Sequence, residues 1–416
     1  MKSEAEILAR TRNAFPALRR MHNGFPVAYF DGPGGTQVPT YVVDAMADYL
    51  YNHNANTHWN FPTSNETDAA LQTARNSVAV FLNCLPSEVA FGANMTTLTF
   101  HVARSIGRGL EAGDEILVTE LDHHANIAPW TALASERGVV IRTAKMDPRS
   151  GQLDWGDLTE KLTTKTKVLA IGAASNALGT ITDVQEATRF AHEHGTKVFV
   201  DAVHYAPHHL PDVRRIGCDY LACSAYKFYG PHVGILFGKQ HELEHLDVPK
   251  LAPAPDTVPE RIETGTLNHE GIVGTGAAID FLAALTKDGK PVPATRDNLE
   301  DAFAFLHETG AILAHQLWDG LNDIPGVTTY GPAPGNQAHP RTPTVSCTVA
   351  GHSAASVCRR LADKGLFVSD GNFYAATVVE RLGVEGLVRI GCACYTSFQE
   401  IERIVEAIHE IASSKA

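Results

Sequence analysis

A regular alternation of short apolar runs and helical segments occupies the chain from Ser87 to Phe237. The runs are rich in β-branched and aromatic residues, and they read "EVAFGA", "DEILVTE", "GVVIRTA", "KVLAIGA", "TKVFVDA", "CDYLACS" and "VGILFG". Helical stretches such as "TTLTFHVARSIGRGL" separate them. Strands that alternate with helices need crossover connections, which produce a mainly parallel sheet with helices on both faces. The sequence therefore predicts an α/β fold.

A stretch containing Pro, Gly and Lys, "LTKDGKPVPATRD", interrupts this alternation from Leu285 to Asp297. Such punctuation is typical of a linker. It divides the chain into a large domain at residues 23–288 and a smaller α+β domain at residues 289–416. The smaller domain is predicted from the strand-like runs "TPTVSCTVAG", "LFVSD" and "LVRIGCACY". The helix predicted within residues 1–22 is expected to pack on it.

Charge and cysteine usage narrow the possible partners. The formal net charge is −13, and no basic run with interleaved aromatic residues predicts nucleic-acid binding. No apolar run has the length of a membrane span, and the N-terminus lacks the apolar core of a signal peptide. Seven scattered cysteines fit a reducing compartment. We expect a cytoplasmic protein that binds small molecules or copies of itself, and neither nucleic acid nor a membrane.

Polar residues follow several of the predicted strands. The segments "TELDHH", "AASN" and "DAVH" stand at strand ends, and ligands of open α/β sheets bind beyond the carboxyl ends of the strands. Asp201 ends one strand, and Lys227 lies 26 residues later, just after the next one. A carboxylate and an amine are thus expected at the same sheet edge.

Two interpretations explain this pair. One is a buried salt bridge, which is costly unless its geometry is good. The other is a pyridoxal-phosphate site, in which Lys227 forms a Schiff base with the cofactor aldehyde and Asp201 keeps the pyridine nitrogen protonated. In that case the imine masks the charge of a lysine placed in the apolar stretch "CSAYKFYGPHVGILFG".

Motifs along nearly the whole chain, from about Phe15 to the last helix, resemble the cysteine desulfurase and selenocysteine lyase group of class V aminotransferase-fold enzymes. They are "FPVAYFDGPGGTQVP", "DHHANIAPW", "ASNALGT", "VDAVHYAPHH", "CSAYKFYGP", "ETGT" and "VRIGCACY". The resemblance implies a fold-type I, pyridoxal-phosphate-dependent transferase with an amino-acid substrate. It also implies a homodimer that shares its active sites.

The resemblance assigns contacts to the cofactor ring. Together with Lys227 and Asp201, His123 is expected to be catalytic, stacked on the pyridine ring where it helps to guide protons. His204 stands where the desulfurases usually carry glutamine and would hydrogen-bond the ring oxygen. Asn176 would contact the phenolic side of the cofactor or the substrate. Alternatives remain open: a structural or metal-binding role for the two adjacent histidines, a turn at Asn176, and a structural role for His204.

The resemblance also assigns the phosphate contacts. Ser224 would bind the phosphate through its hydroxyl. Asn94, Met95 and Thr96 in "GANMTT" would add contacts where a helix is predicted to begin. Tyr226 takes a place usually held by a histidine that contacts the phosphate.

Further residues are assigned to the substrate and to the second subunit. Arg389 matches the arginine that grips the substrate carboxylate, a task for which a planar fork is suited. Asn176 and His58, the latter in "NHNANTHWNFPTSNET", are expected to contribute to substrate binding. Thr266 in "ETGT" matches a residue that the family sends into the neighbouring subunit's phosphate site; otherwise it is part of an ordinary turn.

One departure from the family bears on the reaction. Related desulfurases carry a cysteine on a loop before the carboxylate-binding arginine, and its thiolate attacks the substrate sulfur. The segment from Val368 to Arg389 contains no cysteine, and Tyr374 stands about where the thiol is expected. Cys392 and Cys394 are predicted to be core residues of a strand. We therefore expect β-elimination from cysteine or a cysteine conjugate; transamination or epimerisation of another amino acid, and true desulfuration, remain alternatives.

A competing motif, "HELEH" at 241–245, matches the H-E-x-x-H pattern of zinc proteases. It lies in a short polar stretch that Pro249 soon ends, whereas a catalytic zinc helix is longer and partly buried. The sequence therefore predicts no metal site.

Overall fold

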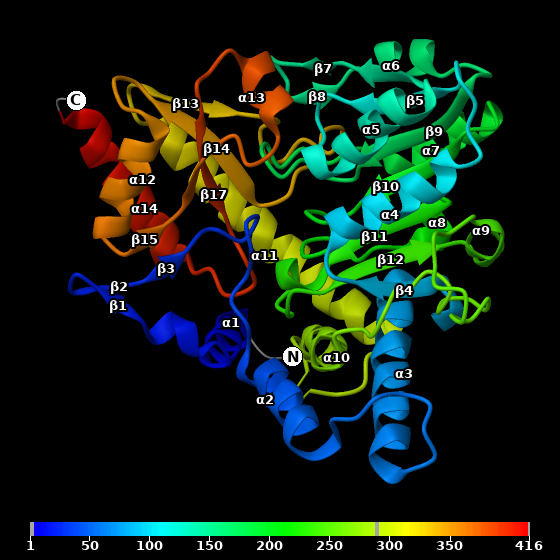
Figure 1. Ribbon diagram of the computed structural model, residues 1–416. Helices are drawn as coiled ribbons and strands as arrows, with labels where there is room; N and C mark the ends of the chain where they lie inside the picture. Colours follow the sequence, from blue (N-terminus) through cyan, green and yellow to red (C-terminus); the bar gives the residue numbers. More distant parts are fainter. Residues whose placement is uncertain (1–3, 288–290, 415–416) are drawn as a thin grey trace.

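The computed structural model describes residues 4–287 and 291–414. Its larger unit contains a seven-stranded sheet of order β4-β12-β11-β10-β9-β5-β6 (Figure 1). Neighbouring strands are parallel except at β12, which runs antiparallel to β11 and β4. The predicted α/β fold is confirmed. Each strand corresponds to one of the seven apolar runs, and only β9 starts outside its run, by one residue: β4 (Val89–Gly92), β5 (Glu115–Thr119), β6 (Val140–Ala144), β9 (Thr166–Gly172), β10 (Lys197–Asp201), β11 (Tyr220–Ser224) and β12 (Gly234–Gly238).

Helices cover both faces of this sheet, because successive side chains of a strand point to opposite faces. In β10, Val198 and Val200 pack into one core and Phe199 into another, and all three are fully buried. This burial explains why the strands are apolar at nearly every position. The first core includes residues of α3 (Pro62–Leu82), α7 (Val184–Glu193) and α10 (His269–Ala283), and the second includes residues of α4 (Met95–Gly107) and α5 (Ala128–Arg137).

The smaller unit is an antiparallel sheet of order β13-β14-β17-β16 with helices packed on it. Its own core confirms the α+β character predicted for this part of the chain. β17 ends at Gly391, so Cys392 and Cys394 follow the strand and do not lie within it as predicted. The elements are β13 (Val327–Tyr330), β14 (Thr344–Val349), β15 (Leu366–Phe367), β16 (Ser369–Gly371), β17 (Leu387–Gly391), α12 (Ala354–Asp363), α13 (Ala376–Leu382) and α14 (Phe398–Ser413).

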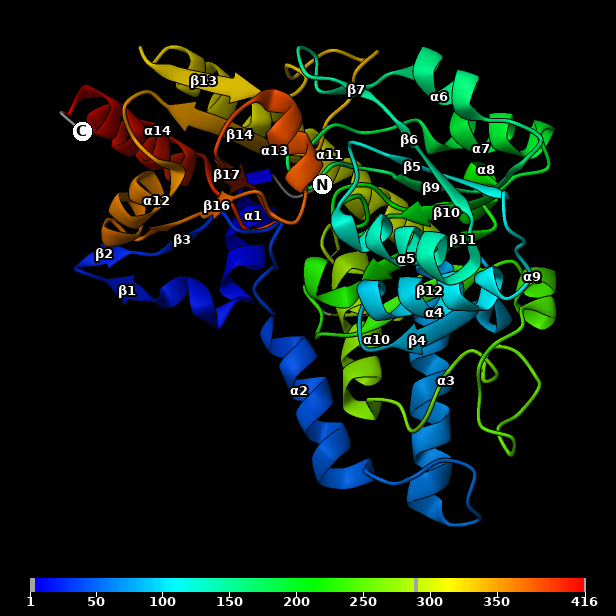
Figure 2. The same cartoon turned by 45° about the horizontal axis from the view of Figure 1, so that its top comes forward.

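Two segments join the units. β3 (Ala28–Tyr29) pairs in parallel with β15, and this places an N-terminal strand beside the smaller unit (Figure 2). The long helix α11 (Arg296–Asn322) contributes Leu299 to the core of the larger unit and Leu317 to that of the smaller one. The predicted boundary between residues 288 and 289 lies outside the described residues.

The N-terminal helix α1 (Glu4–Asn13) contacts both units. Arg10 donates to the carbonyl of Leu285, and Arg12 forms a 2.8 Å ion pair with Glu400 of α14. The remaining elements are the strands β1 (Met21–His22), β2 (Phe25–Pro26), β7 (Met146–Asp147) and β8 (Gln152–Leu153), the α-helices α2 (Thr40–Asp48), α6 (Trp155–Lys161), α8 (Val213–Ile216) and α9 (Gln240–His245), the 3-10 turns Pro16–Arg19, Pro86–Glu88, His124–Asn126 and Ala225–Lys227, and the π turn Tyr49–His53. None of the helices in the described ranges combines the length and apolar character needed to cross a bilayer.

Candidate active site

A cavity of about 950 Å³ opens at the carboxyl ends of the parallel strands. Most of its polar wall comes from the residues that follow β4, β5, β9, β10 and β11, and the smaller unit adds Arg389 and the segment before α13. This is where an open α/β sheet binds its ligands. The cavity brings together most of the residues predicted from the sequence: Asn94, Met95, Thr96, His123, Asn176, Asp201, His204, Ser224, Lys227 and Arg389.

Lys227 ends a 3-10 turn directly after β11 and is buried. Its Nζ donates to the carbonyl oxygens of Pro33 and Gly34, the latter at 2.9 Å. Burial and the charge of Arg389 lower the pKa of Lys227 to about 8. The neutral amine is therefore populated to about one tenth at pH 7 and to about one half near pH 8.

Asp201 lies at the end of β10 and accepts a hydrogen bond of 2.9 Å from the amide of Val203. Burial raises the pKa of its carboxyl to about 6, although the Lys227 charge acts in the opposite sense. Within the described ranges no ion pair joins Asp201 to Lys227, so the simple buried salt bridge is not what the structure contains. The two groups instead face the same cavity as separate polar sites.

The amino end of α4 forms one side of the cavity. Asn94 caps the helix, because its side-chain oxygen accepts from the amide of Thr97 at 2.9 Å. The amide of Met95 donates to Ser224 Oγ at 3.0 Å, and Thr96 is exposed to the cavity. Free amides and the helix dipole at such an end favour a phosphate or carboxylate.

His123 lies on the loop that follows β5. Its Nδ1 accepts from the amide of Ala125 at 2.9 Å, so the neutral ring carries its proton on Nε2. Burial, with the charges of Lys227 and Arg389 among the causes, lowers the pKa of His123 to about 4. A flat, uncharged imidazole therefore lines the cavity, with the Tyr374 ring 5.6 Å away between centroids.

Asp122 is a cavity residue that the sequence analysis did not single out. It is fully buried and accepts hydrogen bonds from Thr119 Oγ1 at 2.6 Å and Asn126 Nδ2 at 3.2 Å. Burial is the main reason why its pKa rises to about 7. The sequence feature that could have identified Asp122 is its place in "LDHH", between a strand end and two histidines.

Arg389 of β17 is held in a fixed orientation by its neighbours. Nε and Nη2 lie 3.2 and 3.0 Å from Ser369 Oγ, Nη1 donates to the Asn176 carbonyl at 3.1 Å, and Nη2 lies 3.3 Å from Asp31 Oδ1. The guanidinium also sits 4.2 Å from the centre of the Phe373 ring. Sequence reasoning missed Ser369 and Asp31, although Asp31 belongs to the motif "FDGPGG".

The segment before α13 closes the cavity with two aromatic residues. Phe373 and Tyr374 both adopt left-handed backbone conformations, with φ of 54° and 57°, which is uncommon for bulky residues. Their carbonyls are held by the larger unit, since Asn176 Nδ2 donates to Phe373 at 2.9 Å and the His124 amide donates to Tyr374 at 2.7 Å. Among the described residues that line this cavity, none is a cysteine.

Two buried polar atoms of the cavity wall have no partner among the described residues: Nδ1 of His204 and Oδ1 of Asn176. Unpaired buried polar atoms are costly. A polar ligand that fills the cavity would relieve both. Tyr226, which stands at the place usually held by a histidine, also lines the cavity, and its ring stacks on that of His232 with the ring centroids 4.8 Å apart.

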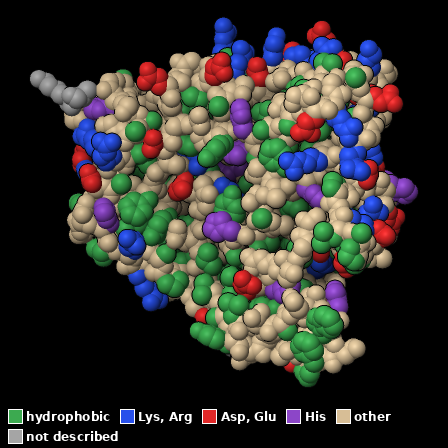
Figure 3. All heavy atoms as spheres, in the orientation of Figure 1, with side chains coloured by type: hydrophobic (Ala, Val, Ile, Leu, Met, Phe, Trp, Pro, Cys, Tyr) green, Lys and Arg blue, Asp and Glu red, His purple; other side chains and the backbone are tan. Residues whose placement is uncertain are grey.

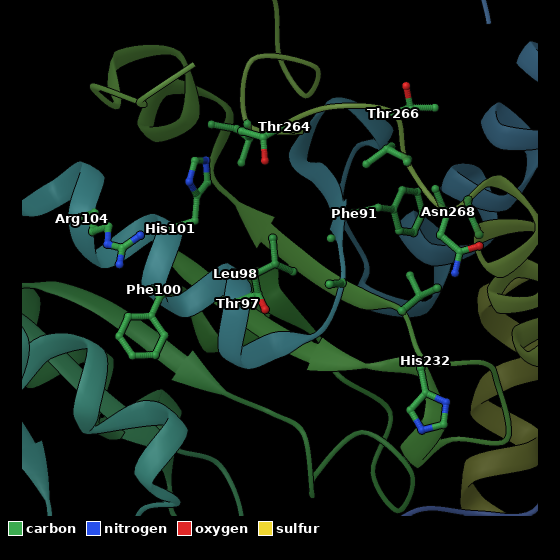
Figure 4. A pocket seen from close by; sticks show the side chains of 16 residues that line it. Phe91, Thr97, Leu98, Phe100, His101, Arg104, His232, Thr264, Thr266 and Asn268 are labelled. Atoms are coloured by element: carbon green, nitrogen blue, oxygen red, sulfur yellow. The ribbon is translucent and has the colours of Figure 1, made fainter. Parts of the chain in front are cut away.

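Two predicted residues lie outside this cavity. Thr266 lines a neighbouring cavity of about 590 Å³. Thr264 and Thr266 lie on the same segment at this cavity, and His101 and Arg104 reach it from α4 (Figure 4). His58 is exposed over 76% of its side chain and lies 3.4 Å from the Asp68 carboxylate.

The metal interpretations find no support in the geometry. Glu242 of the "HELEH" motif pairs with Lys197 and accepts from the Tyr220 hydroxyl, and His245 Nδ1 contacts the carbonyl of His241. Across residues 4–287 and 291–414, no cluster of three or more His, Cys, Asp or Glu side chains could hold a metal ion.

Comparison with known proteins points to one family. The family model described as Aminotransferase class-V matches residues 28–404. The chain is 33% identical over 418 residues to a cysteine desulfurase of Synechococcus elongatus, but spans only 63% of the length of that relative. It is 31% identical to a cysteine desulfurase of Dickeya dadantii, with 97% of this chain and 96% of the relative covered. The apo structure of a cysteine desulfurase from Thermococcus onnurineus matches with a TM-score of 0.87 and 26% identity, covering 99% of this chain and 98% of that one.

Proposed function

The chain belongs to the aminotransferase class-V family, and we propose that it is a pyridoxal-phosphate-dependent carbon–sulfur lyase. Its substrate would be cysteine or a cysteine conjugate, from which it releases a thiol, pyruvate and ammonia. The family supports an enzyme similar to cysteine desulfurases. The choice of elimination rests on the cavity.

The donors and acceptors of the cavity fit this cofactor. Lys227 would hold the aldehyde carbon, and Asp201 would lie at the pyridine nitrogen. The amide end of α4, with Ser224, suits the phosphate. The neutral ring of His123 suits the flat cofactor ring, and the unpaired Nδ1 of His204 suits a ring oxygen.

The reaction begins with the substrate bound by its carboxylate to Arg389, whose guanidinium presents several N–H donors. When bound, pyridoxal phosphate supplies an electron sink for the charge left at Cα. Lys227, displaced from the aldehyde carbon by the amino group of the substrate, would be free as a neutral amine to take the Cα proton. The carboxylate of Asp201, ionised above about pH 6, would hold the proton of the pyridine nitrogen.

Elimination then needs no protein nucleophile. The Cβ–S bond breaks with its electron pair on sulfur, the sulfur gains a proton, and the thiol leaves. Water converts the remaining three-carbon fragment to pyruvate and ammonia. A desulfurase instead needs a thiolate that attacks the substrate sulfur.

The single observation that carries this choice is the aromatic closure of the cavity. Phe373 and Tyr374 occupy the segment between β16 and β17 that reaches the cavity, and no described cysteine lines it. Burial also raises the pKa of Cys392 and of Cys394 to about 12, which leaves neither as a thiolate near neutral pH.

The test is to incubate the loaded protein with L-cysteine and with S-methyl-L-cysteine and to assay every product separately. Elimination predicts thiol or sulfide, pyruvate and ammonia in equal amounts. Sulfide released with alanine in place of pyruvate would refute elimination in favour of desulfuration. A different keto acid, or loss of optical purity without a thiol, would support transamination or epimerisation. Lys227→Ala is expected to abolish the visible absorbance of the bound cofactor.

We further propose that the working unit is a homodimer. Apolar side chains exposed by more than two fifths gather around the tip formed by α2 and the start of α3 (Figure 3): Val43, Leu50, Tyr51, Trp59 and Phe61. An exposed apolar patch of this kind favours a protein partner. Thr266 and His58, exposed and outside the cavity of their own chain, would then serve the cavity of the second copy. Sedimentation of the purified protein as a monomer would contradict this.

A further inference from the structure

His204 is held by two hydroxyl groups from the smaller unit. It follows β10 in the larger unit, is 3% exposed and lines the cavity. Its Nε2 lies 3.0 Å from Thr342 Oγ1 and 3.1 Å from Thr344 Oγ1. Both threonines are fully buried, and Thr344 begins β14. One ring nitrogen is therefore anchored across the junction of the two units.

The hydrogen-bond partners determine which nitrogen carries the proton. A buried hydroxyl needs an acceptor for its own proton. Thr342 Oγ1 has a second partner, the Gly179 carbonyl at 3.4 Å, whereas in the described part of the chain Thr344 Oγ1 contacts only His204 Nε2. The Thr344 proton is satisfied when Nε2 is the acceptor. A neutral ring with an unprotonated Nε2 carries its proton on Nδ1.

The surroundings keep this ring neutral. Burial lowers the pKa of His204 far below its ordinary value, and the titratable groups facing it act in the same direction: His208, Arg389, Lys227 and His209. The remaining variable is the tautomer. Nδ1, buried and without a partner in the described residues, is thereby left as a free N–H donor.

We propose that Thr342 and Thr344 are positioning residues, which fix His204 as the Nδ1–H tautomer so that its ring donates a hydrogen bond to an anionic oxygen of the cofactor. An amide side chain can always offer a donor, but an imidazole offers one at Nδ1 only while its other nitrogen is an acceptor. A histidine at this place therefore needs a hydroxyl donor at its Nε2. The identity of the oxygen rests on the proposed function; the tautomer is a property of the chain itself.

The first test uses the cofactor-free protein. With ¹⁵N-labelled histidine, the nitrogen chemical shifts separate protonated from unprotonated ring nitrogens, and comparison with His204→Phe assigns the signals. The wild-type ring is expected to show a protonated Nδ1 and an unprotonated Nε2. Thr344→Val should shift the proton to Nε2, which can then donate to Thr342, while Thr344→Ser should match the wild type. A protonated Nε2 in the wild type overturns the inference, even if Thr344→Val does not fold.

The second test uses the visible absorbance of the loaded protein as a function of pH. A donated hydrogen bond stabilises the deprotonated form of its partner, so its loss in Thr344→Val should raise the pH midpoint by about one unit. His204→Phe should give a shift in the same direction. Ser346→Ala is the matched control, because it removes another buried hydroxyl of β14 that donates to the Ala177 carbonyl and not to His204. An unchanged midpoint in Thr344→Val overturns the inference. Failure of the wild type to bind the cofactor would end the proposed function, while the nitrogen shifts would still decide the tautomer.

Discussion

Replacing Arg389 by lysine is expected to weaken the binding of an amino-acid carboxylate while keeping the positive charge. The guanidinium is buried and oriented by Ser369 Oγ, the Asn176 carbonyl and Asp31 Oδ1, at distances from 3.0 to 3.3 Å. A lysine ammonium cannot reproduce this planar fork. It would retain charge attraction but lose the paired geometry on which a carboxylate depends.

The magnitude follows from the hydrogen bonds at stake. A hydrogen bond to a charged group contributes about 1.5–3 kcal/mol. Loss of one such bond to the substrate carboxylate corresponds to an increase in KM of about 10- to 100-fold. The value of kcat should fall less, because the carboxylate is bound both before and during the proton transfer.

The assay compares two substrates that differ only in the carboxylate, S-methyl-L-cysteine and 2-(methylthio)ethylamine. The wild type should prefer the amino acid strongly, and Arg389→Lys should lose most of that preference. Arg75→Lys is the control, because Arg75 is also buried and paired, with Glu263 at 2.9 Å, but does not line the cavity. If Arg389→Lys keeps the wild-type preference for the amino acid, the assignment of Arg389 to the carboxylate is wrong.

Four further outcomes follow from the site. Asp201→Asn should retain the bound cofactor but lower turnover by about 100-fold or more, as measured by pyruvate release; unchanged turnover would exclude Asp201 from the pyridine nitrogen. The rate of cofactor loading, followed by absorbance, should rise with pH through a midpoint near 8, the pKa of Lys227, and level off above it. Asp31→Asn should lower that midpoint, because the Asp31 carboxylate raises the pKa of Lys227; a midpoint that rises would contradict this. Asn94→Ala should destabilise α4 by about 1 kcal/mol and weaken cofactor binding, whereas loss of the corresponding cap of α7 in Asp183→Ala should cost similar stability with unchanged binding.

The sheet could be predicted from the sequence because its strands, apart from the edge strand β6, are largely buried on both faces. Strands such as β11 and β12 are buried throughout, and this produces runs that stand out from the helices between them. The antiparallel direction of β12 left no such signal. A strand that is buried on both faces has the same composition whichever way it runs.

The cavity residues differ in how well the sequence predicts their place. Asp201, His123 and Lys227 follow predicted strands, so the topology alone places them at one edge. Asp31 reaches Arg389 from a distant part of the chain, and Ser369 lies opposite it on the neighbouring strand β16. Their positions depend on the register of β16 with β17 and on the pairing of Asp31 with Gly391 at the end of β17, which local patterns do not encode.

The contacts of Arg389 indicate how a carboxylate enters the cavity. Its bonds to Ser369 and to the Asn176 carbonyl orient the side chain, whereas the bond to Asp31 satisfies its charge. The Asp31 contact is the longest, at 3.3 Å, and the Asp31 side chain is 45% exposed. Asp31 Oδ1 also accepts a hydrogen bond of 2.7 Å from Ser369 Oγ, so a substrate carboxylate that took its place would have to replace both bonds, while the Asn176 carbonyl would keep the guanidinium aligned.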